Sequence, residues 1–309
     1  MIKKTLYFGN PAYLSLHLGQ LIIKLPEMKN GDSSCNSNKA QRTIPIEDIG
    51  IIVLDNKQIT ITNGLIEVLV KNQVAIISCD SHSMPLGLFL PLTGNSTFNE
   101  HFRQQIECSI PLKKQLWQQT IKAKIQNQAL CLQKHTKNSI EPLLSMVRKV
   151  KSGDTDNCEA QAAVYYWKNL FPNIPHFVRD RNGQPPNNLL NYGYAILRSI
   201  VARNLIISGL LPIYGIHHHN KCNEYCLADD VMEPYRPYID DLVITIMKEN
   251  KNCDTLSKDI KSVLLTIPTI DVTINEKRSP LIVAVGTTTA SLAKCFKGSI
   301  RKIEYPMFI

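Results

Sequence analysis

The spacing of hydrophobic residues changes near residue 92, and this change limits what the chain can fold into. Between residues 14 and 25, aliphatic residues stand at every second position on both sides of Gly19, which is typical of a β-hairpin with one buried face. Between residues 111 and 134, apolar residues recur at the spacing of an amphipathic helix. The alternating set is Leu14, Leu16, Leu18, Leu21, Ile23 and Leu25, and the helical set is Trp117, Ile121, Ile125 and Leu132. We therefore expect an α+β protein.

The remaining patterns divide the chain into two domains. Short apolar runs bounded by Asp, Asn, Gly and Pro predict strands at 49–54, 59–61, 74–79 and 86–90, with a helix at 63–72. Helical periodicity predicts helices at 140–151, 157–171, 187–210, 230–249, 255–265 and 281–296. We expect a small N-terminal β-rich domain at 1–92, a linker at 93–98 and a larger all-helical domain at 99–309.

Composition excludes several classes of protein. Of the 309 residues, 44% are hydrophobic and 20% are charged, which excludes disordered, collagen-like and disulfide-stapled architectures. The longest apolar run, residues 194–216, contains two arginines and an asparagine and does not suit a bilayer. The N-terminus lacks the pattern of a signal peptide, and the nine cysteines are an odd number. We therefore expect reduced thiols, a cytoplasmic location and no membrane contact.

Positive charge is concentrated in one segment. The chain has 35 Lys and Arg residues against 26 Asp and Glu residues, and residues 100–151 hold ten of the basic residues against three Glu and no Asp. If Lys113, Lys114, Lys122 and Lys124 share a face, they would bind DNA phosphates and make the affinity depend on salt. The same residues also fit a solvated helix surface, and charge alone does not decide between the two.

The densest group of metal-binding residue types lies at 215–237, in GIHHHNKCNEYCLADDVMEPYRP. One interpretation is a zinc site of Cys222, Cys226 and a histidine, although a C-x₃-C pair without a second cysteine pair is an unusual spacing for structural zinc. Another combines one histidine with Asp230 and Glu233, which share a helix face and suit Mg²⁺ or Mn²⁺. A third needs no metal, with Asp230 as a helix cap and Glu233 paired with Arg236.

A further carboxylate stands upstream at Glu159, in DTDNCEAQAAVYYW. Asp156 is placed to cap a helix there, and Ala162 and Ala163 leave room beside Glu159 for another helix or an ion. A glutamate in a first helical turn is also favoured by the helix dipole alone. Glu159 is therefore a candidate metal ligand, but its motif alone fits a purely structural role at least as well.

Three segments together resemble a known family. Residues 159–167, 187–199 (NNLLNYGYAILRS) and 215–237 are similar, in sequence and in order, to the CRISPR-associated adaptation integrase, the first of the Cas proteins, in its type II form. The run L-x-x-D-x-M-E-P-x-R-P at 227–237 is the most specific part. The resemblance covers nearly the whole chain, and that family also has a β-rich domain ahead of a helical one.

The resemblance implies a set of site residues. In the family pattern E-x-x-x-A-x-x-Y the glutamate is a metal ligand, and here it is Glu159. A histidine fifteen positions before the acidic ligand of the M-E-P segment supplies another, which selects His218 when Glu233 is that acidic ligand. Asp230 then supports catalysis from beside the ligands, and the cofactor is Mg²⁺ or Mn²⁺. The expected DNA contacts are Lys113, Lys114, Lys122, Lys124, Tyr166 and Arg236.

The resemblance also implies function and partners. The expected protein is a metal-dependent DNA integrase and endonuclease of CRISPR adaptive immunity, which inserts short foreign duplexes as spacers by attack of a 3′-hydroxyl on the CRISPR array. Expected partners are prespacer and leader-repeat DNA, a second copy of the chain bound through the β-rich domain, the small second adaptation protein in a heterohexamer, and the type II effector nuclease. Two alternatives stay open: a general metal-dependent DNA repair nuclease, and a non-catalytic zinc-stabilised nucleic-acid-binding protein.

Overall fold

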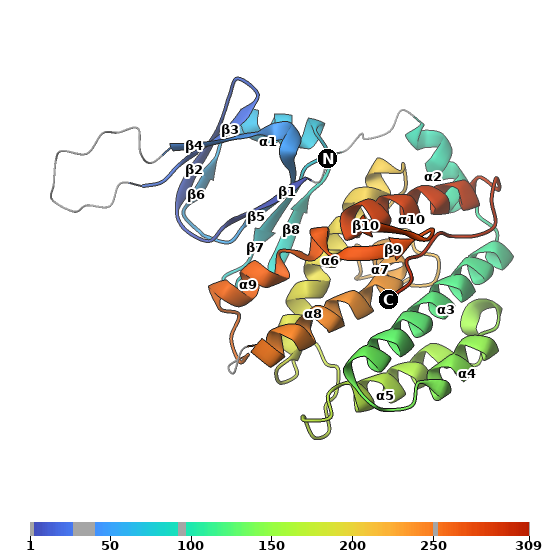
Figure 1. Cartoon of the computed structure of the whole chain (residues 1–309). Coiled ribbons are helices and arrows are strands. Elements are labelled where there is room, and N and C mark those ends of the chain that lie inside the picture. Colours follow the sequence, from blue (N-terminus) through green and yellow to red (C-terminus); the bar gives the residue numbers. More distant parts are fainter. Residues whose placement is uncertain (1–2, 27–40, 92–96, 250–252, 309) are drawn as a thin grey trace. The chain divides into compact units, whose positions relative to one another are not determined.

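The computed structural model describes residues 3–26, 41–91, 97–249 and 253–308 (Figure 1). The chain forms two compact units, residues 1–94 and 95–309. The first is built mainly of strands and the second mainly of helices, which confirms the predicted α+β class. The predicted linker at 93–98 lies outside the described residues apart from Thr97 and Phe98.

Two four-stranded sheets form the N-terminal unit. Its strands are β1 (Lys4–Phe8), β2 (Ala12–His17), β3 (Gln20–Lys24), β4 (Gln41–Pro45), β5 (Ile49–Leu54), β6 (Ile59–Ile61), β7 (Ala75–Cys79) and β8 (Pro85–Phe89), with a short 3₁₀ turn η1 (Ile46–Asp48) and one helix, α1 (Asn63–Lys71). One sheet has the order β1-β5-β7-β8, in which β1, β5 and β7 are parallel and β8 is antiparallel to β7. The other has the order β4-β3-β2-β6.

The predicted hairpin forms between β2 and β3. Leu18 and Gly19 are its two turn residues, with φ angles of 44° and 72°. Positive φ at both positions matches the twist of an antiparallel pair, and Gly19 has no Cβ to oppose it. Leu14 is fully buried, but Leu18 is 87% exposed. The expectation that Leu18 continues the buried face was wrong, because the chain reverses there before the sequence alternation ends.

An aliphatic core holds this unit together. Ile49, Ile51 and Ile52 on β5 have no exposed surface, as expected of a central parallel strand that is covered on both faces. Leu65 and Leu69 of α1 pack into one cluster with Ile49 and Ile52. Burying one such side chain contributes about 1.5–3 kcal/mol, so this core accounts for the stability of the unit without buried polar groups.

Helices form most of the C-terminal unit. They are α2 (Phe98–Ile106), α3 (Ile110–His135), α4 (Glu141–Lys149), α5 (Cys158–Leu170), α6 (Asn187–Ile207), α7 (Cys226–Met232), α8 (Arg236–Glu249), α9 (Lys258–Leu264) and α10 (Leu281–Phe296), with 3₁₀ turns η2 (Ser152–Asp154), η3 (Glu233–Tyr235) and η4 (Ile267–Thr269). Besides its helices the unit contains a hairpin of β9 (Asp271–Ile274) and β10 (Lys277–Pro280). None of the described helices is both long enough and apolar enough to cross a bilayer.

The predicted helix at 230–249 is divided. It begins earlier, at Cys226, and is interrupted by the turn η3 before α8 continues to Glu249. Pro234 lies in that turn, and a proline has no N–H to donate to the preceding helical turn. The interruption therefore lies within the M-E-P segment, and Glu233 is the first residue of the turn.

The 26-residue helix α3 is the centre of packing in this unit. It contacts α4, α5, α8 and the turn η3 (Figure 1). Its buried residues include Trp117 and Lys124, which are two turns apart and therefore on one face. The end of the chain also docks on α3, since Asn127 accepts the N–H of Phe308 and donates to the carbonyl of Pro306.

Candidate functional site

Asp154 sets the start of α5 and with it the position of Glu159. Its carboxylate accepts the backbone N–H groups of Cys158 and Glu159, both at 2.9 Å, which the start of a helix otherwise leaves without partners. Asp156, the predicted cap, instead forms an ion pair with Lys151 at 2.8 Å. Glu159 thus stands in the first turn of α5, with its side chain 24% exposed.

Asp230 organises the histidine loop, residues 215–219. Its Oδ2 accepts the N–H groups of Ile216 and His217 at 2.7 and 2.9 Å, and its Oδ1 lies 2.5 Å from Nδ1 of His218. Asp230 is fully buried. Gly215 is required in this loop, because a Cβ there would lie 2.4 Å from the carbonyl oxygen of His218. A buried carboxylate bound to one ring nitrogen is the arrangement that orients metal-binding histidines.

The three histidines have different surroundings. His217 stacks on Trp117 of α3, with ring centroids 4.2 Å apart and planes within 3°. The same indole meets the ring of His218 edge-on, with centroids 5.6 Å apart. His219 is exposed. With Nδ1 bound to Asp230, His218 keeps Nε2 as the nitrogen available to a metal ion, so the geometry favours His218 over its two neighbours.

Lys124 brings the two glutamates together. Its Nζ lies 2.7 Å from Oε1 of Glu159 and 2.6 Å from Oε2 of Glu233. The side chain of Lys124 is 11% exposed and that of Glu233 is 5% exposed. The other oxygen of Glu233, Oε1, lies 3.0 Å from Nη2 of Arg236, whose guanidinium is 4.7 Å from the ring centroid of Tyr194. Two carboxylates therefore meet two cations in a largely buried cluster.

The protonation states in this cluster follow from the contacts. Burial disfavours the charge on Glu233, but Arg236 and Lys124 outweigh it and hold the pKa of Glu233 below its ordinary value. Burial also opposes the charge on Lys124, yet the attraction of Glu233 and Glu159 raises the pKa of Lys124. The hydrogen bond to Asp230 raises the pKa of His218, whereas burial lowers the pKa of His217.

The donors of this cluster fit a divalent cation. Both glutamates already converge on one positive charge, the Lys124 ammonium, and carboxylate and imidazole donors suit Mg²⁺ or Mn²⁺. Oε2 of Glu233 is buried without a hydrogen bond of good geometry, so only its ion pair with Lys124 satisfies it. In the part of the chain that the structure describes, no three His, Cys, Asp or Glu side chains are close enough to hold an ion together.

Two expected DNA contacts lie inside the protein. Tyr166 is completely buried and its hydroxyl donates to Asp240 at 2.8 Å, so the prediction that it contacts DNA was wrong. Lys124 contacts the two glutamates rather than the solvent, which corrects its assignment as a surface phosphate ligand. Arg236 contacts Glu233 and lies over the Tyr194 ring, but its side chain is 27% exposed, so its expected contact with DNA stays a prediction. Sequence spacing could not distinguish the inward from the outward faces of these helices.

The cysteines form no zinc cluster within the described residues. Cys222 is exposed and Cys226 is buried, with its Sγ 3.8 and 3.3 Å from the carbonyl oxygens of Asn220 and Asn223. Burial raises the pKa of Cys226, which disfavours the thiolate that zinc requires. The described geometry therefore gives no support to a zinc-stabilised fold at this loop.

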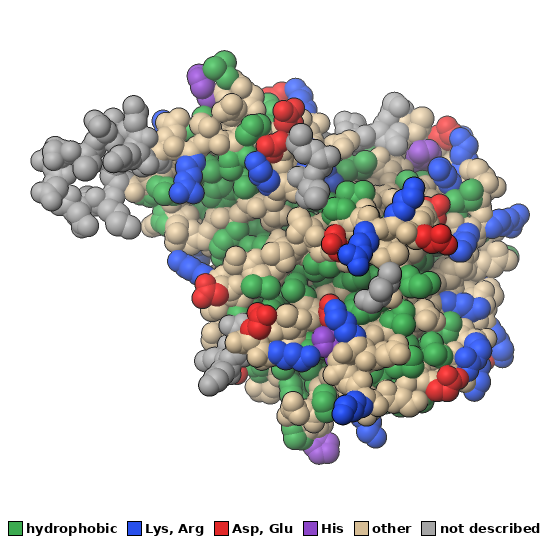
Figure 2. Space-filling model, in the orientation of Figure 1, with side chains coloured by type: hydrophobic (Ala, Val, Ile, Leu, Met, Phe, Trp, Pro, Cys, Tyr) green, Lys and Arg blue, Asp and Glu red, His purple; other side chains and the backbone are tan. Residues whose placement is uncertain are grey.

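A basic groove lies between α3 and the end of α4. Lys122, Arg148, Lys149 and Lys151 line it, and its volume is about 720 Å³. Figure 2 shows Lys and Arg side chains gathered over α4 and the neighbouring end of α3. The other two expected lysines lie outside its lining: Lys113 is 4.4 Å from the ring centroid of Tyr214, and the stem of Lys114 packs beside Gly153.

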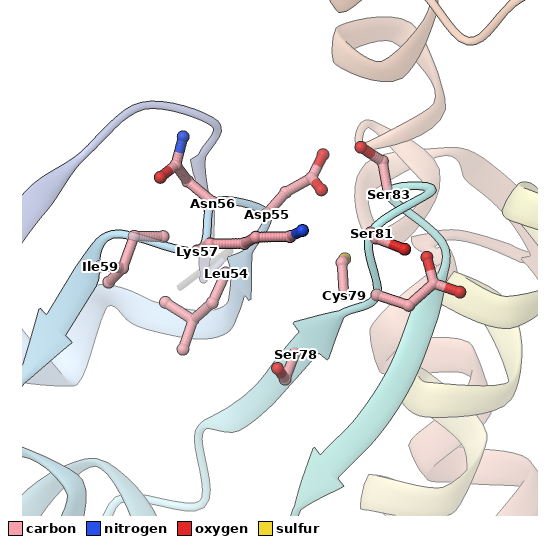
Figure 3. A pocket seen from close by; sticks show the side chains of 10 residues that line it. Leu54, Asp55, Asn56, Lys57, Ile59, Ser78, Cys79, Ser81 and Ser83 are labelled. Atoms are coloured by element: carbon pink, nitrogen blue, oxygen red, sulfur yellow. The ribbon is translucent and has the colours of Figure 1, made fainter.

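A second pocket lies wholly within the N-terminal unit, at the carboxyl ends of β5 and β7. It has a volume of about 420 Å³ and is lined by polar residues. Figure 3 shows Asp55 and Lys57 on one loop facing Ser81 and Ser83 on the other. The carboxylate of Asp55 is occupied by the hydroxyl of Tyr7 at 2.5 Å, and the lining contains no histidine. This pocket therefore lacks the donor set found in the helical unit.

Sequence reasoning missed two residues that shape the helical cluster. Trp117 packs against two histidine rings. Asp240 accepts the hydroxyls of Tyr166 and Tyr194 at 2.8 and 2.5 Å, and burial raises its pKa to about 6. Asp240 stands four residues after Arg236, on the same face of α8, and that spacing was the signal available in the sequence.

Comparison with known proteins places the chain in a family. The sequence profile of the family described as "CRISPR associated protein Cas1" matches residues 8–276. A curated relative, the CRISPR-associated endonuclease Cas1 of Neisseria meningitidis serogroup C (strain 8013), is 34% identical over 293 residues, which cover 94% of this chain and 91% of that protein.

Solved structures share the fold. A casposase bound to integration product matches with a TM-score of 0.76 at 19% identity and covers 98% of this chain and 92% of that one. A chain of a Cas6-RT-Cas1–Cas2 complex matches with a TM-score of 0.73 at 18% identity and covers 97% of this chain and 36% of that one. The family match and the Neisseria relative confirm the resemblance seen in the sequence. This chain belongs to the Cas1 family, the endonucleases and integrases of CRISPR adaptation.

Proposed function

We propose that Glu159, His218 and Glu233 bind one divalent cation, Mg²⁺ or Mn²⁺, at the place where this chain joins DNA. The observation that carries the proposal is the meeting of Glu159 and Glu233 on one buried positive charge. His218 lies close enough for both glutamates to contribute to the rise of its pKa, after the larger effect of its hydrogen bond to Asp230. When bound, the ion acts as a Lewis acid that polarises a phosphodiester and stabilises the charge on its oxygens.

The chain's own residues prepare this cluster before DNA binds. Asp230 holds His218 in one tautomer and one orientation. Arg236 fixes Oε1 of Glu233, and Asp154 anchors the helix start from which Glu159 extends. Ligands held in this way need less rearrangement when the reacting groups arrive, which is how preorganised sites lower an activation barrier.

The proposed reaction is transesterification on the CRISPR array. The 3′-hydroxyl of a short incoming duplex attacks a phosphodiester at the leader-repeat boundary, forming one P–O bond while the bond to the leaving 3′-oxygen breaks. The basic groove of Lys122, Arg148, Lys149 and Lys151 would bind backbone phosphates of prespacer or target without reading bases. The fold shared with a casposase bound to integration product supports this assignment.

The same proposal extends to partners and location. The chain would form a homodimer through its N-terminal β-rich domain, a heterohexamer with the small second adaptation protein, and a contact with the type II effector nuclease. The shared fold of a chain in the Cas6-RT-Cas1–Cas2 complex supports the second adaptation protein as a partner. The buried cysteines Cys131, Cys158, Cys226 and Cys295 carry free thiols, which fits the reducing cytoplasm.

Strand transfer tests the proposal. A short duplex with a free 3′-hydroxyl is offered to a supercoiled plasmid carrying a repeat, with the small partner protein, with and without Mn²⁺. We expect metal-dependent joining that Glu159→Ala and His218→Ala abolish and that His219→Ala, a change at the exposed neighbour, retains. Joining that survives His218→Ala would remove this residue from the ligand set. Fragments without joined product would support the general repair nuclease instead.

A further inference from the structure

Lys124 occupies the place that an ion bound to the two glutamates would need. Its Nζ contacts one oxygen of Glu159 at 2.7 Å and one oxygen of Glu233 at 2.6 Å. A Mg²⁺ ion lies about 2.0–2.1 Å from its oxygen ligands. An ammonium and a divalent ion on the same oxygens would repel strongly in a site with little water. The two cations therefore exclude one another at these contacts.

Both oxygens of Glu233 already contact a cation. Oε1 is paired with Arg236 and Oε2 with Lys124, so a metal ion that binds Glu233 must share an oxygen with one of these cations or displace it, and repulsion between cations in a site with little water favours displacement. Arg236 stands three residues from Glu233 and its guanidinium is stacked on Tyr194. Lys124 reaches the cluster from a different helix, at the end of a flexible four-carbon stem. Lys124 is therefore the partner that can leave at the lower cost.

We propose that Lys124 is a positioning residue that holds Glu159 and Glu233 together before the metal binds and is displaced by the incoming divalent cation. This inference rests on the proposed metal ligands. It gives the lysine two opposite effects, since the ammonium stabilises the metal-free protein and competes with the metal.

The stabilising effect follows from burial of like charges. Glu233 is nearly inaccessible and Glu159 is three-quarters covered, so the two carboxylates lose hydration and repel each other when no cation stands between them. Removal of the lysine charge should therefore destabilise the metal-free fold. A divalent ion should restore the stability, because a ligand that binds only the folded state favours that state.

Lys124→Met separates the two effects, because it keeps the length of the stem and removes the charge. The probe is Mn²⁺ alone, without DNA, with the dissociation constant from calorimetry and the melting temperature in chelator and in Mn²⁺. We expect Mn²⁺ to bind more tightly than to wild type, on the order of 10-fold. The melting temperature in chelator should fall, and Mn²⁺ should raise it by more than in wild type.

Lys134→Met is the matched control. It removes a lysine from the same helix whose carboxylate partner, Asp241 at 2.9 Å, lies outside the cluster. Its Mn²⁺ affinity should equal that of wild type. Mn²⁺ affinity that is unchanged or weaker in Lys124→Met would overturn the proposal, because a lysine that only shapes the site weakens binding when it is removed.

Glu233→Gln distinguishes this failure from failure of the proposed site. Mn²⁺ binding that survives Glu233→Gln unchanged would show that the ligand set is wrong, and both proposals would fall. If Lys124→Met does not fold without metal, acetylation of wild-type lysines followed by peptide mass spectrometry decides the question. Mn²⁺ should then increase the labelling of Lys124 and leave that of Lys134 unchanged, and equal labelling of Lys124 in both conditions contradicts displacement.

Discussion

The two units of this protein bury different kinds of side chain. Across the described residues, every buried polar or charged side chain lies in the helical unit, whereas the core of the N-terminal unit is aliphatic. The buried charges of the helical unit include Lys124, Asp230, Glu233 and Asp240. Apolar burial stabilises a fold, while buried ions cost free energy unless they are well paired. Buried ions therefore point to functional sites, and here two of them, Lys124 and Glu233, are paired with each other.

The largest expected effect on stability lies in the aliphatic core. Ile52→Ala removes a fully buried side chain of β5 and should lower the free energy of unfolding by about 2–5 kcal/mol. Both tryptophans, Trp117 and Trp167, belong to the helical unit. Circular dichroism in urea should therefore show an earlier transition while tryptophan fluorescence keeps its midpoint.

The matched change in the helical unit is Ile125→Ala, which removes a fully buried side chain of α3. It should move the fluorescence midpoint directly. Ile52→Ala could instead move the fluorescence midpoint as far as the circular dichroism midpoint. The two units would then unfold together, which contradicts the view that each has a separate core.

Asp240 offers a test of the buried polar groups through pH. Its pKa in the fold, about 6, lies above the ordinary value of 3.8. The folded state therefore holds this proton more tightly, so the stabilisation is complete below pH 3.8 and is lost as the pH rises through about 6. In wild type this lowers the free energy of unfolding as the pH rises. Asp240→Asn should make that fall smaller by about 3 kcal/mol, as measured by urea unfolding at about pH 4, 5, 6 and 7.

The neighbouring Asp241 provides a control of opposite sign. Burial favours a higher pKa for this carboxyl, but hydrogen bonds from His135 and Lys134 hold the pKa below its ordinary value. The stabilisation that Asp241 provides is therefore lost as the pH falls. Asp241→Asn should instead reduce the loss of the free energy of unfolding at acidic pH. Identical pH slopes in wild type and Asp240→Asn would refute the assignment to Asp240.

Asp230 tests whether the buried ions serve the site rather than the fold alone. Asp230→Asn replaces the carboxylate that orients His218 and should weaken Mn²⁺ binding about 10–100-fold. Asp229→Asn is the comparison, since Asp229 pairs with Arg198 and Asn223 instead. Equal losses of Mn²⁺ affinity in the two variants would mean that the orientation of His218 is not what the carboxylate contributes.

The smallest expected effect on stability is at the basic groove. Lys122→Glu with Lys149→Glu should change the free energy of unfolding by less than about 0.5 kcal/mol per site, because neither side chain is buried. Affinity for duplex DNA should fall, and the slope of log affinity against log salt should decrease by about 0.9 for each phosphate that is no longer neutralised. Lys168→Glu, an exposed change on α5, should leave that slope unchanged. An unchanged slope in the double variant would mean that the groove is a solvated surface that does not bind DNA phosphates.

Local patterns predicted most of the secondary structure, because the strands alternate and the longer helices carry an apolar stripe. The helix predicted at 157–171 is α5 at Cys158–Leu170, and the one predicted at 281–296 is α10 with the same bounds. The helix α2 (Phe98–Ile106) was not predicted, since FNEHFRQQI contains few apolar residues. The hairpin of β9 and β10 was not predicted either, because strands of four residues are too short for their period to stand out.

The sequence by itself determined the order of a β-rich and a helical part, the family, and the candidate ligands Glu159, His218 and Glu233. The order of the two parts depends on local periodicity, whereas the family and the ligand set depend on the resemblance of three sequence segments to a known family. Only the tertiary structure decided that Lys124 faces inward to Glu159, 35 residues away in sequence, and that Tyr166 is buried on Asp240, 74 residues away. Whether a lysine or tyrosine on a helix meets solvent or a carboxylate depends on which helix packs against that face, and this is set by the whole core.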